Sequence, residues 1–502
     1  MLMLFENDFK IILPEIFLIL NLLLLLVYGV LYSTSINKNY PILLKNISWL
    51  SLIILSFTFL LYKNNNIINA IVFYNSIILD NWTYLFKILI IIGTILSIII
   101  SIDYVEKENF NSFEYIILIL ISCISMLLLV SSIDFISMYL TIELQSLCFY
   151  VIASFKRNSE FSTEAGIKYF ILGAFSSGLL LFGFSLIYGF TGTTNILQLS
   201  NIFICGVQQM WISTGSLRAC ELGMIFILVG FLFKLTAVPF HMWAPDVYEG
   251  APTSVTAFFS IVPKIAILGI FLRIFLEGFY NFMSPWQKVI IFCSFCSMLF
   301  GSLAAMAQNK IKRLLAFSSI GHVGFLLIGF SCGTLEGLQS LIFYLIIYIL
   351  MTVNIFAIIL SPIRRNFTNK IQHIKYSTDF AMLSKTNSLL AFTLCINLFS
   401  MAGIPPLAGF YSKAFLFFAA LSSSLYILAV IGIITSVISC FYYIRIIKII
   451  YFEKTKNWSS FYRISKENSI TLGFSLFILI FFIAYPTPLY FWTHKAVLTF
   501  CI

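Results

Sequence analysis

Runs of apolar residues, separated by short polar stretches, follow one another along the whole chain. A helix of about 20 apolar residues spans the hydrocarbon core of a bilayer, so the runs predict an all-α polytopic membrane protein with about fourteen transmembrane helices. We place them near 11–31, 42–61, 82–101, 114–132, 135–155, 164–190, 222–243, 254–276, 287–307, 313–331, 337–360, 387–421, 425–450 and 469–486.

Proline interrupts the seventh and the twelfth of these predicted helices. Pro239 lies near the end of the seventh, and Pro405 and Pro406 lie in the middle of the twelfth, which is too long for one simple crossing. Proline removes a backbone hydrogen bond and breaks or kinks a helix. Because irregular backbone at membrane depth must face protein or water, both breaks predict functional segments.

The spacing of the two interrupted helices predicts an internal repeat. They lie five helices apart, and a five-helix unit repeated in tandem must be inverted in the membrane because five is odd. Helices 4–8 and 9–13 would form the two units, and paired interruptions of this kind indicate a transport pathway. The predicted domains are 1–110 (three N-terminal helices), 111–280 and 281–452 (the two repeats), and 453–502 (a basic loop and the C-terminal helix).

Composition excludes a soluble protein. The 502 residues are 60% hydrophobic and 10% charged, whereas soluble domains average about 25% charged residues. Most of the 30 Lys and Arg fall in loops after odd-numbered helices, which therefore face the cytoplasm or matrix. An even number of helices then places both termini on the outer side. No basic patch on a soluble surface indicates nucleic-acid binding.

Three other segments carry weaker expectations. The N-terminal residues lack the pattern of a transit or signal peptide, so we expect insertion in the membrane where the chain is made. The outer loop 191–220 is expected to be a solvated linker, or to form a hairpin or short amphipathic helix. The basic inner loop 361–386 is expected to be a solvated linker or to fold locally.

Neither a metal nor a redox cofactor is predicted in this chain. The ten cysteines are scattered, and the pair Cys293 and Cys296 has no second pair or histidine nearby. Zinc and iron–sulfur sites need about four ligands. Motifs for dinucleotides, nucleoside triphosphates and bis-histidine haem are missing from the sequence as well.

Several ionisable residues fall inside the predicted helices, at a cost of roughly 2.5–3.5 kcal/mol for each central charge. They are Glu143, Lys168, Lys234, Lys264, His322 and Lys413. One carboxylate pairs with one lysine at a time, and we expect Glu143 to pair with Lys234. Burial disfavours the charged form of the remaining lysines, and imidazole titrates near neutrality. The set therefore predicts a chain of proton-transfer residues.

Other polar residues near the helices can be explained by structural roles. Lys87 lies close to a predicted interface, where its long side chain can reach the headgroups, so we expect a structural role. Asp246 and Glu249 follow the seventh helix, and a loop or capping role and a proton-exit role both stay open. The role of His241 is open as well. No set of nucleophile, base and orienting group appears among these residues.

Six stretches resemble a known family: LPEIF at 13–17, IELQSLCFYVIAS at 142–154, STEAGIKYFILGAFSSG at 162–178, FKLTAVPFHMWAPDVYEGAPT at 233–253, KRLLAFSSIGHVG at 312–324 and MAGIPPLAGFYSK at 401–413. Over nearly its whole length the chain resembles the antiporter-like membrane subunits of respiratory complex I, NADH:ubiquinone oxidoreductase, in their mitochondrial form. The resemblance implies a fourteen-helix fold with two inverted repeats and one proton channel without a cofactor. FMN, iron–sulfur clusters, NADH and ubiquinone would be bound by other subunits.

The resemblance also implies a location and residue roles. The chain would lie in the mitochondrial inner membrane, among neighbouring antiporter-like and small membrane subunits and membrane lipids. The family's functional glutamate and lysines fall on Glu143, Lys168, Lys234 and Lys264, and its helix 12 site falls on Lys413, where a lysine favours the subunit 2 type over the subunit 4 type. Quinone reduction elsewhere would perturb the pair of Glu143 and Lys234, and a proton would pass from Lys264 through His322 to Lys413.

Three other readings stay open beside this one. A subunit of a multisubunit cation/proton antiporter would share the same lysines but would be driven by an ion gradient. A scaffold that has lost transport and a plastid relative that uses plastoquinone are the others. Co-purification with flavin and iron–sulfur partners, or with a flavin-free assembly, would separate the first two.

Overall fold

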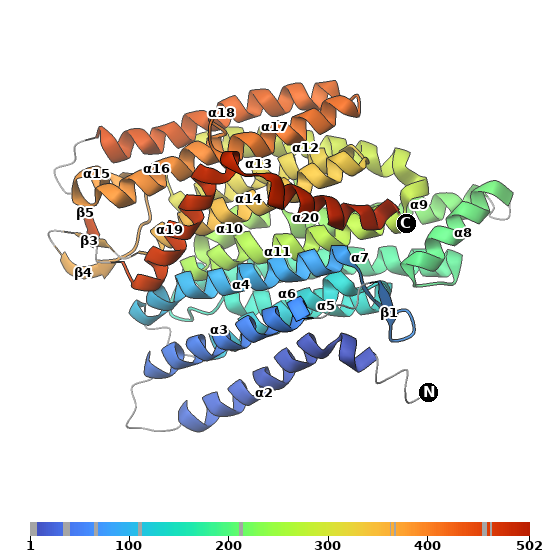
Figure 1. Cartoon of the computed structure of the whole chain (residues 1–502), viewed down its shortest axis with the longest axis horizontal. Coiled ribbons are helices and arrows are strands. Elements are labelled where there is room, and N and C mark those ends of the chain that lie inside the picture. Colours follow the sequence, from blue (N-terminus) through green and yellow to red (C-terminus); the bar gives the residue numbers. More distant parts are fainter. Residues whose placement is uncertain are drawn as a thin grey trace.

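The chain is an elongated bundle of helices that lie side by side (Figure 1). The computed structural model describes residues 8–33, 41–64, 69–108, 113–209, 214–361, 363–365, 368–453, 459–461 and 464–501. In this part of the chain, twelve helices are long and apolar enough to cross a membrane. The predicted class, a polytopic helical membrane protein, is confirmed, while the count of fourteen crossings and the inverted repeat stay predictions.

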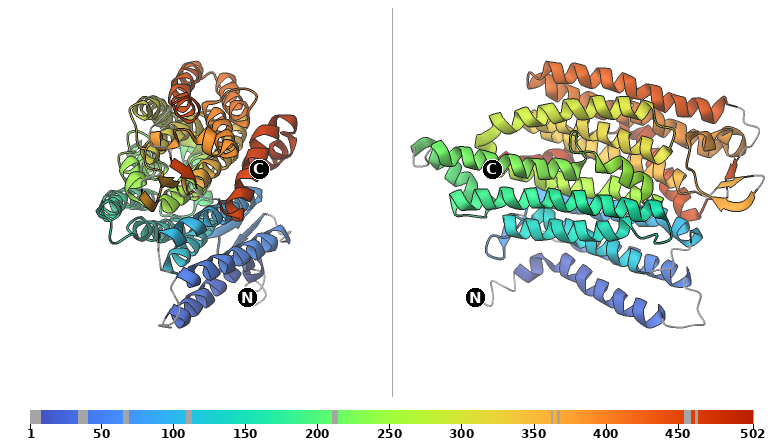
Figure 2. Two further views of the ribbon diagram at one scale, coloured as in Figure 1. Left: turned by 90° about the vertical axis from the view of Figure 1, so that its left-hand side faces the viewer. Right: turned by 180° about the vertical axis from the view of Figure 1, so that it is seen from behind.

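Three helices at the N-terminal side form one edge of the bundle (Figure 2). They are α2 (Leu13–Ser33), α3 (Pro41–Asn64) and α4 (Asn81–Lys107), with a small hairpin of β1 (Ala70–Val72) and β2 (Ile77–Leu79) before α4. Helix α4 begins where it does because Asp80 and Thr83 form a reciprocal capping box.

The next group of helices surrounds the first break. The bounds are α5 (Glu114–Ser131), α6 (Phe135–Ala153), α7 (Glu160–Thr191), α8 (Ile196–Gln209), α9 (Thr214–Leu235), α10 (Trp243–Gly250) and α11 (Thr253–Arg273), which continues as a π-helical turn, Ile274–Gly278. A 3₁₀ turn, Tyr280–Phe282, leads to the following helix. The expected local structure in 191–220 is present as α8, apart from residues 210–213, which lie outside the described part.

The last group surrounds the second break. The bounds are α12 (Met283–Met306), α13 (Ile311–Ser331), α14 (Leu335–Ile359), α15 (Leu383–Thr386), α16 (Ser388–Ala402), α17 (Ala408–Ser422), α18 (Tyr426–Tyr451), α19 (Lys466–Phe481) and α20 (Thr487–Val497). Three 3₁₀ turns accompany them: Ser377–Phe380, Phe482–Ala484 and Leu498–Cys501. A three-stranded antiparallel sheet of β4 (Thr368–Gln372), β3 (Ile363–Arg365) and β5 (Ser459–Phe461) lies at one end.

Three helices form the centre of the bundle. The apolar stretch of α11 is entirely buried, and those of α13 and α14 are almost entirely buried. In the apolar stretches of α2 and α18, by contrast, most residues are not buried. The outer helices expose large apolar side chains such as Leu24 and Val437. Lipid or neighbouring subunits can cover such side chains, whereas the polar residues of α11, α13 and α14 are enclosed by the fold itself.

Both interruptions predicted from proline are present. Helix α9 ends at Leu235, before Pro239, and the chain resumes as α10. Helix α16 ends at Ala402 and α17 begins at Ala408, with Pro405 and Pro406 between them. Each break contains one cis peptide bond before proline.

Candidate functional site

The first break places Lys234 at the end of a half-helix. Beyond Leu235 the backbone of Thr236 is left-handed, with a φ of 66°. The carbonyl oxygen of Phe233 accepts hydrogen bonds from the backbone N–H of Thr236 at 3.1 Å and from Trp243 Nε1 at 3.0 Å, and the second of these ties the break to α10. The carbonyl end of a helix has partial negative charge and favours a cation, so the break gives Lys234 a favourable position for an ammonium group.

A cavity lies beside this lysine and reaches Lys264. It is lined by Lys234, Lys264, Gln145, Tyr169 and Tyr248 among others. We call it the lysine cavity. The amine of Lys234 is buried without a hydrogen-bond partner in the described part of the chain. Two amines that face one cavity can exchange a proton through water there.

Glu143 does not touch Lys234 in this structure. No ion pair of 4.0 Å or less joins them within the described residues, and one carboxylate oxygen of Glu143 is buried without a partner. The other oxygen accepts a contact from the hydroxyl of Ser146 at 3.3 Å. Ser146 also lines the lysine cavity, so Glu143 lies next to that cavity rather than in contact with the amine.

Lys264 lies on the fully buried helix α11 and is bound by a neutral oxygen. Its Nζ donates a hydrogen bond to the hydroxyl of Tyr348 on α14 at 3.0 Å and lies 5.1 Å from the centre of the same ring. The lysine is only 2% exposed. Pro263, just before it, leaves one carbonyl of the preceding turn without its helical partner.

His322 is held between two tyrosines. Its Nδ1 lies 2.5 Å from the hydroxyl of Tyr344, and its Nε2 lies 3.4 Å from the hydroxyl of Tyr443. The imidazole is buried on α13. Both ring nitrogens therefore have hydroxyl partners, and a hydroxyl can donate to either nitrogen or accept from it.

The second break binds Lys413. Its Nζ donates hydrogen bonds to the carbonyl oxygens of Met401 and Ala402, at 2.9 and 3.0 Å, at the end of α16. Gly403, which follows, has a φ of 89°, and a side-chain carbon there would lie 3.1 Å from Lys413 Cδ. Pro405 and Pro406 thus follow a half-helix whose last carbonyl oxygens bind a buried amine.

Lys168 lies elsewhere, and the prediction that it is buried is wrong. Its side chain is 43% exposed and forms ion pairs with Glu164 at 2.7 Å and Asp246 at 3.2 Å. Lys168 lies near the N-terminal end of α7, a helix of 32 residues. Asp246 also faces Arg313 at 3.8 Å, so this end of the bundle is a surface ion-pair network.

Two further acidic and basic residues complete that network. Glu249 of α10 pairs with Lys310 and lies 3.5 Å from Arg313. Asp246 and Glu249, whose role the sequence left open, therefore both bind cations of α13 or its N-terminal flank. His241 is buried with its ring edge on Phe300, and its Nδ1 is without a partner in the described residues.

The interfacial reading of Lys87 is also wrong. Lys87 is 0% exposed and pairs with Glu15 of α2 at 2.5 Å. Its partner Glu15 lies 72 positions away in the sequence, so no local pattern links the two residues. This pair joins α2 to α4 and does not lie in the lysine cavity.

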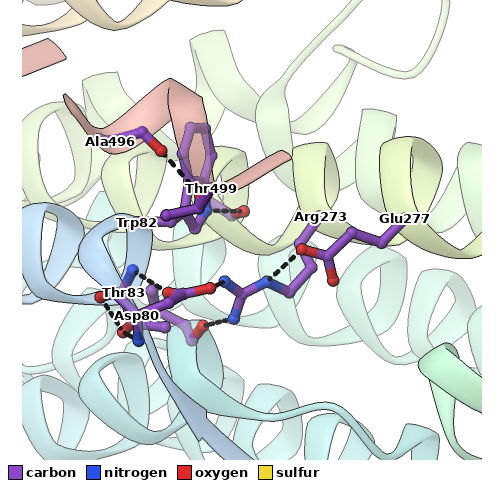
Figure 3. A network of polar contacts seen from close by, with 9 residues as sticks. Asp80, Trp82, Thr83, Arg273, Glu277, Ala496 and Thr499 are labelled. Atoms are coloured by element: carbon purple, nitrogen blue, oxygen red, sulfur yellow. Dashed lines mark hydrogen bonds and ion pairs between the residues drawn. The ribbon is translucent and has the colours of Figure 1, made fainter. Parts of the chain in front are cut away.

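A second buried ion network was missed. The guanidinium group of Arg273 lies between Asp80 and Glu277, at 2.5 and 3.5 Å, and Figure 3 shows the three side chains together. Arg273 also donates to the carbonyl of Val130 at 3.4 Å. Arg273 lies at the end of an apolar run and its partner Asp80 lies 193 positions away, so no local pattern in the sequence indicated the pair.

Among the described residues, no group of three or more His, Cys, Asp or Glu could hold a metal ion. Cys293 is buried and Cys296 partly buried, both as free thiols. The enclosed groups include amines, an imidazole and hydroxyl groups, each of which can donate or accept a hydrogen bond in one of its protonation states.

The comparisons with known proteins agree with this class of site. The model of the family described as NADH:quinone oxidoreductase/Mrp antiporter transmembrane proteins matches residues 132–439. Helices broken at two prolines and buried amines beside the breaks define an antiporter-like membrane subunit. The chain belongs to this family, in the branch of NADH-ubiquinone oxidoreductase chain 2 and NADH-quinone oxidoreductase subunit N.

Its relatives match over nearly the full length. NADH-ubiquinone oxidoreductase chain 2 of Marchantia polymorpha is 55% identical over 99% of this chain and 100% of its own. The Arabidopsis thaliana chain 2 is 49% identical, over 98% and 97%. NADH-quinone oxidoreductase subunit N of Pelagibacter ubique is 42% identical, over 96% and 98%.

Two solved structures have the same fold. A chain of respiratory complex I from Thermus thermophilus superposes with a TM-score of 0.77 at 24% identity, covering 95% of this chain and 98% of its own. A chain of the Mrp complex from Dietzia sp. gives 0.80 at 20% identity, with 98% and 97% covered. At these identities the likeness concerns the fold alone.

Proposed function

We propose that this chain is a proton-translocating membrane subunit of respiratory complex I. NADH oxidation and ubiquinone reduction take place in other subunits, which bind the FMN and iron–sulfur clusters. The 49–55% identity to plant chain 2 proteins over the whole chain supports this assignment against an antiporter subunit. The chain would lie in the mitochondrial inner membrane, with both termini on the intermembrane-space side.

The observation on which the proton pathway rests is the row of buried amines without carboxylate partners. Among the described residues, Lys264 and Lys413 bind only neutral oxygens, and Lys234 has no hydrogen-bond partner. A permanent charge at such a place costs roughly 2.5–3.5 kcal/mol. An amine that alternates between charged and neutral forms bears this cost only while it holds the proton.

The proposed route follows the order of these residues in space. A change in the field of Glu143, next to the lysine cavity, alters the proton affinity of Lys234, and the proton moves across the cavity to Lys264. It continues through His322 to Lys413 at the second break. Lys168 belongs to the surface ion-pair network and would take part in proton transfer at that end of the bundle. Moving one charge against 100 mV costs about 2.3 kcal/mol.

The pathway is tested by replacing Lys234 or Lys264 with methionine in the assembled complex. Methionine keeps the length and apolar bulk of the side chain but binds no proton. Each variant should therefore pump fewer protons per NADH oxidised, and the loss should equal the contribution of one channel. Proton uptake and NADH oxidation are measured together in proteoliposomes. Lys288→Met, an exposed lysine on α12, is the matched control and should pump normally.

Normal pumping by both variants in a complex that still contains the subunit would refute the pathway. The antiporter reading predicts instead that the chain co-purifies with a flavin-free assembly that has sodium-dependent activity. A scaffold predicts normal pumping whichever lysine is replaced.

A further inference from the structure

Three cavities follow one another through the centre of the bundle. The lysine cavity includes Tyr248 in its wall, and a second cavity, which we call the middle cavity, is lined by Tyr248, Tyr348 and Ser318. A third, the histidine cavity, is lined by Ser318, His322 and Lys413. Because each cavity shares a wall residue with the next, the three form a row from Lys234 to Lys413.

The amine of Lys264 and the middle cavity are joined by one hydroxyl group. Lys264 lines the lysine cavity, Tyr348 lines the middle cavity, and the hydrogen bond of 3.0 Å between them crosses the wall. Tyr348 is only 1% exposed, and its ring centre lies 5.3 Å from that of His322. The hydroxyl thus lies on the side of the amine that faces the histidine.

Hydroxyl groups suit such a position for a chemical reason. A tyrosine hydroxyl accepts one hydrogen bond and donates another, so it can receive a proton on one side while it releases its own on the other. A protonated lysine side chain only donates hydrogen bonds, and after it has released its proton another donor must supply the next one. A wall made of phenylalanine at this place would interrupt the transfer.

We propose that Tyr348 is a proton-relay residue between Lys264 and the middle cavity, an inference that rests on the proposed function. The ammonium group of Lys264 gives a proton to the oxygen of Tyr348, and the hydroxyl proton of Tyr348 passes to a water molecule in the middle cavity. One N–H and one O–H bond break and two O–H bonds form. The positive charge moves from the amine to the water, and tyrosine stays neutral.

The next step involves the two tyrosines beside His322. The water in the middle cavity delivers its proton past Ser318, which lines both cavities, to the imidazole. Hydroxyl groups lie next to both ring nitrogens, from Tyr344 at Nδ1 and Tyr443 at Nε2, so the ring can gain a proton at one nitrogen and lose one at the other. Tyr443 also lines the histidine cavity, where Lys413 accepts the proton.

The experiment compares Tyr348→Phe with Lys264→Met in the assembled complex. Tyr348→Phe removes the hydroxyl and keeps the ring, so the packing of α14 is preserved. We expect the same loss of protons pumped per NADH oxidised as for Lys264→Met, and no additional loss in the double variant, because both act in one step. The effect of D₂O on the rate of pumping should increase in Tyr348→Phe, which a packing defect would not cause.

Tyr115→Phe is the matched control. Tyr115 is a buried tyrosine of α5 that lines none of the three cavities, and its replacement should leave pumping and its isotope effect unchanged. If Lys264→Met pumps normally, the proposed function itself is refuted. If Lys264→Met is deficient but Tyr348→Phe pumps normally, or if the two losses add, the relay is refuted and the lysine pathway stands.

Discussion

Four buried cations among the described residues fall into two groups that differ in their partners. Lys87 and Arg273 each bind a carboxylate at 2.5 Å, whereas Lys264 and Lys413 bind hydroxyl or carbonyl oxygens. A carboxylate fixes the charge on its partner, and a neutral oxygen does not. The sequence could identify the candidate lysines, but it could not assign their partners. Asp80, for instance, lies 193 positions from Arg273.

Arg273→Met should destabilise the protein, because it leaves the carboxylate of Asp80 buried without its cation. Loss of one member of a buried ion pair typically costs 3–5 kcal/mol. In the double variant Asp80→Asn, Arg273→Met the carboxylate of Asp80 is removed as well and only that of Glu277 lacks its cation, so part of the loss should be recovered. Thermal unfolding of the purified complex measures the stability of the single and the double variant. Equal stability of the single and double variants would contradict a buried pair.

At the level of elements, the apolar runs and the prolines predicted most of the fold. Both breaks lie where the prolines placed them, and each ends on a carbonyl that a side chain binds. Helix α20 was missed because eleven residues with His494 and Lys495 do not form an apolar run. The β-sheets were missed because strands of three to five residues in polar loops have no periodicity that can be recognised.

Gly403→Ala should disturb the second break. The φ of 89° costs a residue with a side chain about 1–2 kcal/mol, and the added carbon would press on Lys413. We therefore expect both lower thermal stability and lower pumping. Gly178→Ala, in α7, has nothing within 4 Å of the added carbon and should change neither. A Gly403→Ala complex that is stable and pumps normally would show that the break tolerates displacement of this amine.

At the scale of the whole molecule, one carboxylate with two partners joins three parts of the chain. Glu108, just after α4, binds His373 at 3.0 Å and Lys156, after α6, at 2.5 Å. His373 follows β4 and therefore belongs to the segment between α14 and α16. The hydrogen bond from His373, together with the ion pair to Lys156, lowers the pKa of Glu108 to about 2. The sequence could not predict this contact, because it unites loops that are distant in the chain.

The contact makes stability depend on pH in a definite direction. The pKa of Glu108 is lower in the folded protein than the ordinary value of about 4.3, so its contribution is complete above pH 4.3 and is lost as the pH falls through about 2. Glu108→Gln should cost about 1.5–3 kcal/mol at pH 7. Thermal unfolding measured from pH 7 to 3 should show that the difference in stability between the variant and the parent protein shrinks below pH 4.3. A difference that stays constant would contradict the assignment.

On the proposed pathway, the size of the three cavities also limits which ion can pass. Each of the three has room for about one water molecule. A hard metal cation keeps about six oxygen atoms around it, and no cavity of this size encloses such a shell. A proton needs no shell, because it moves by exchange of bonds between fixed groups. On the proposed pathway, selectivity against such cations requires no dedicated filter. Replacing the tyrosines between the cavities with alanine would remove both the size limit and the hydroxyl relay.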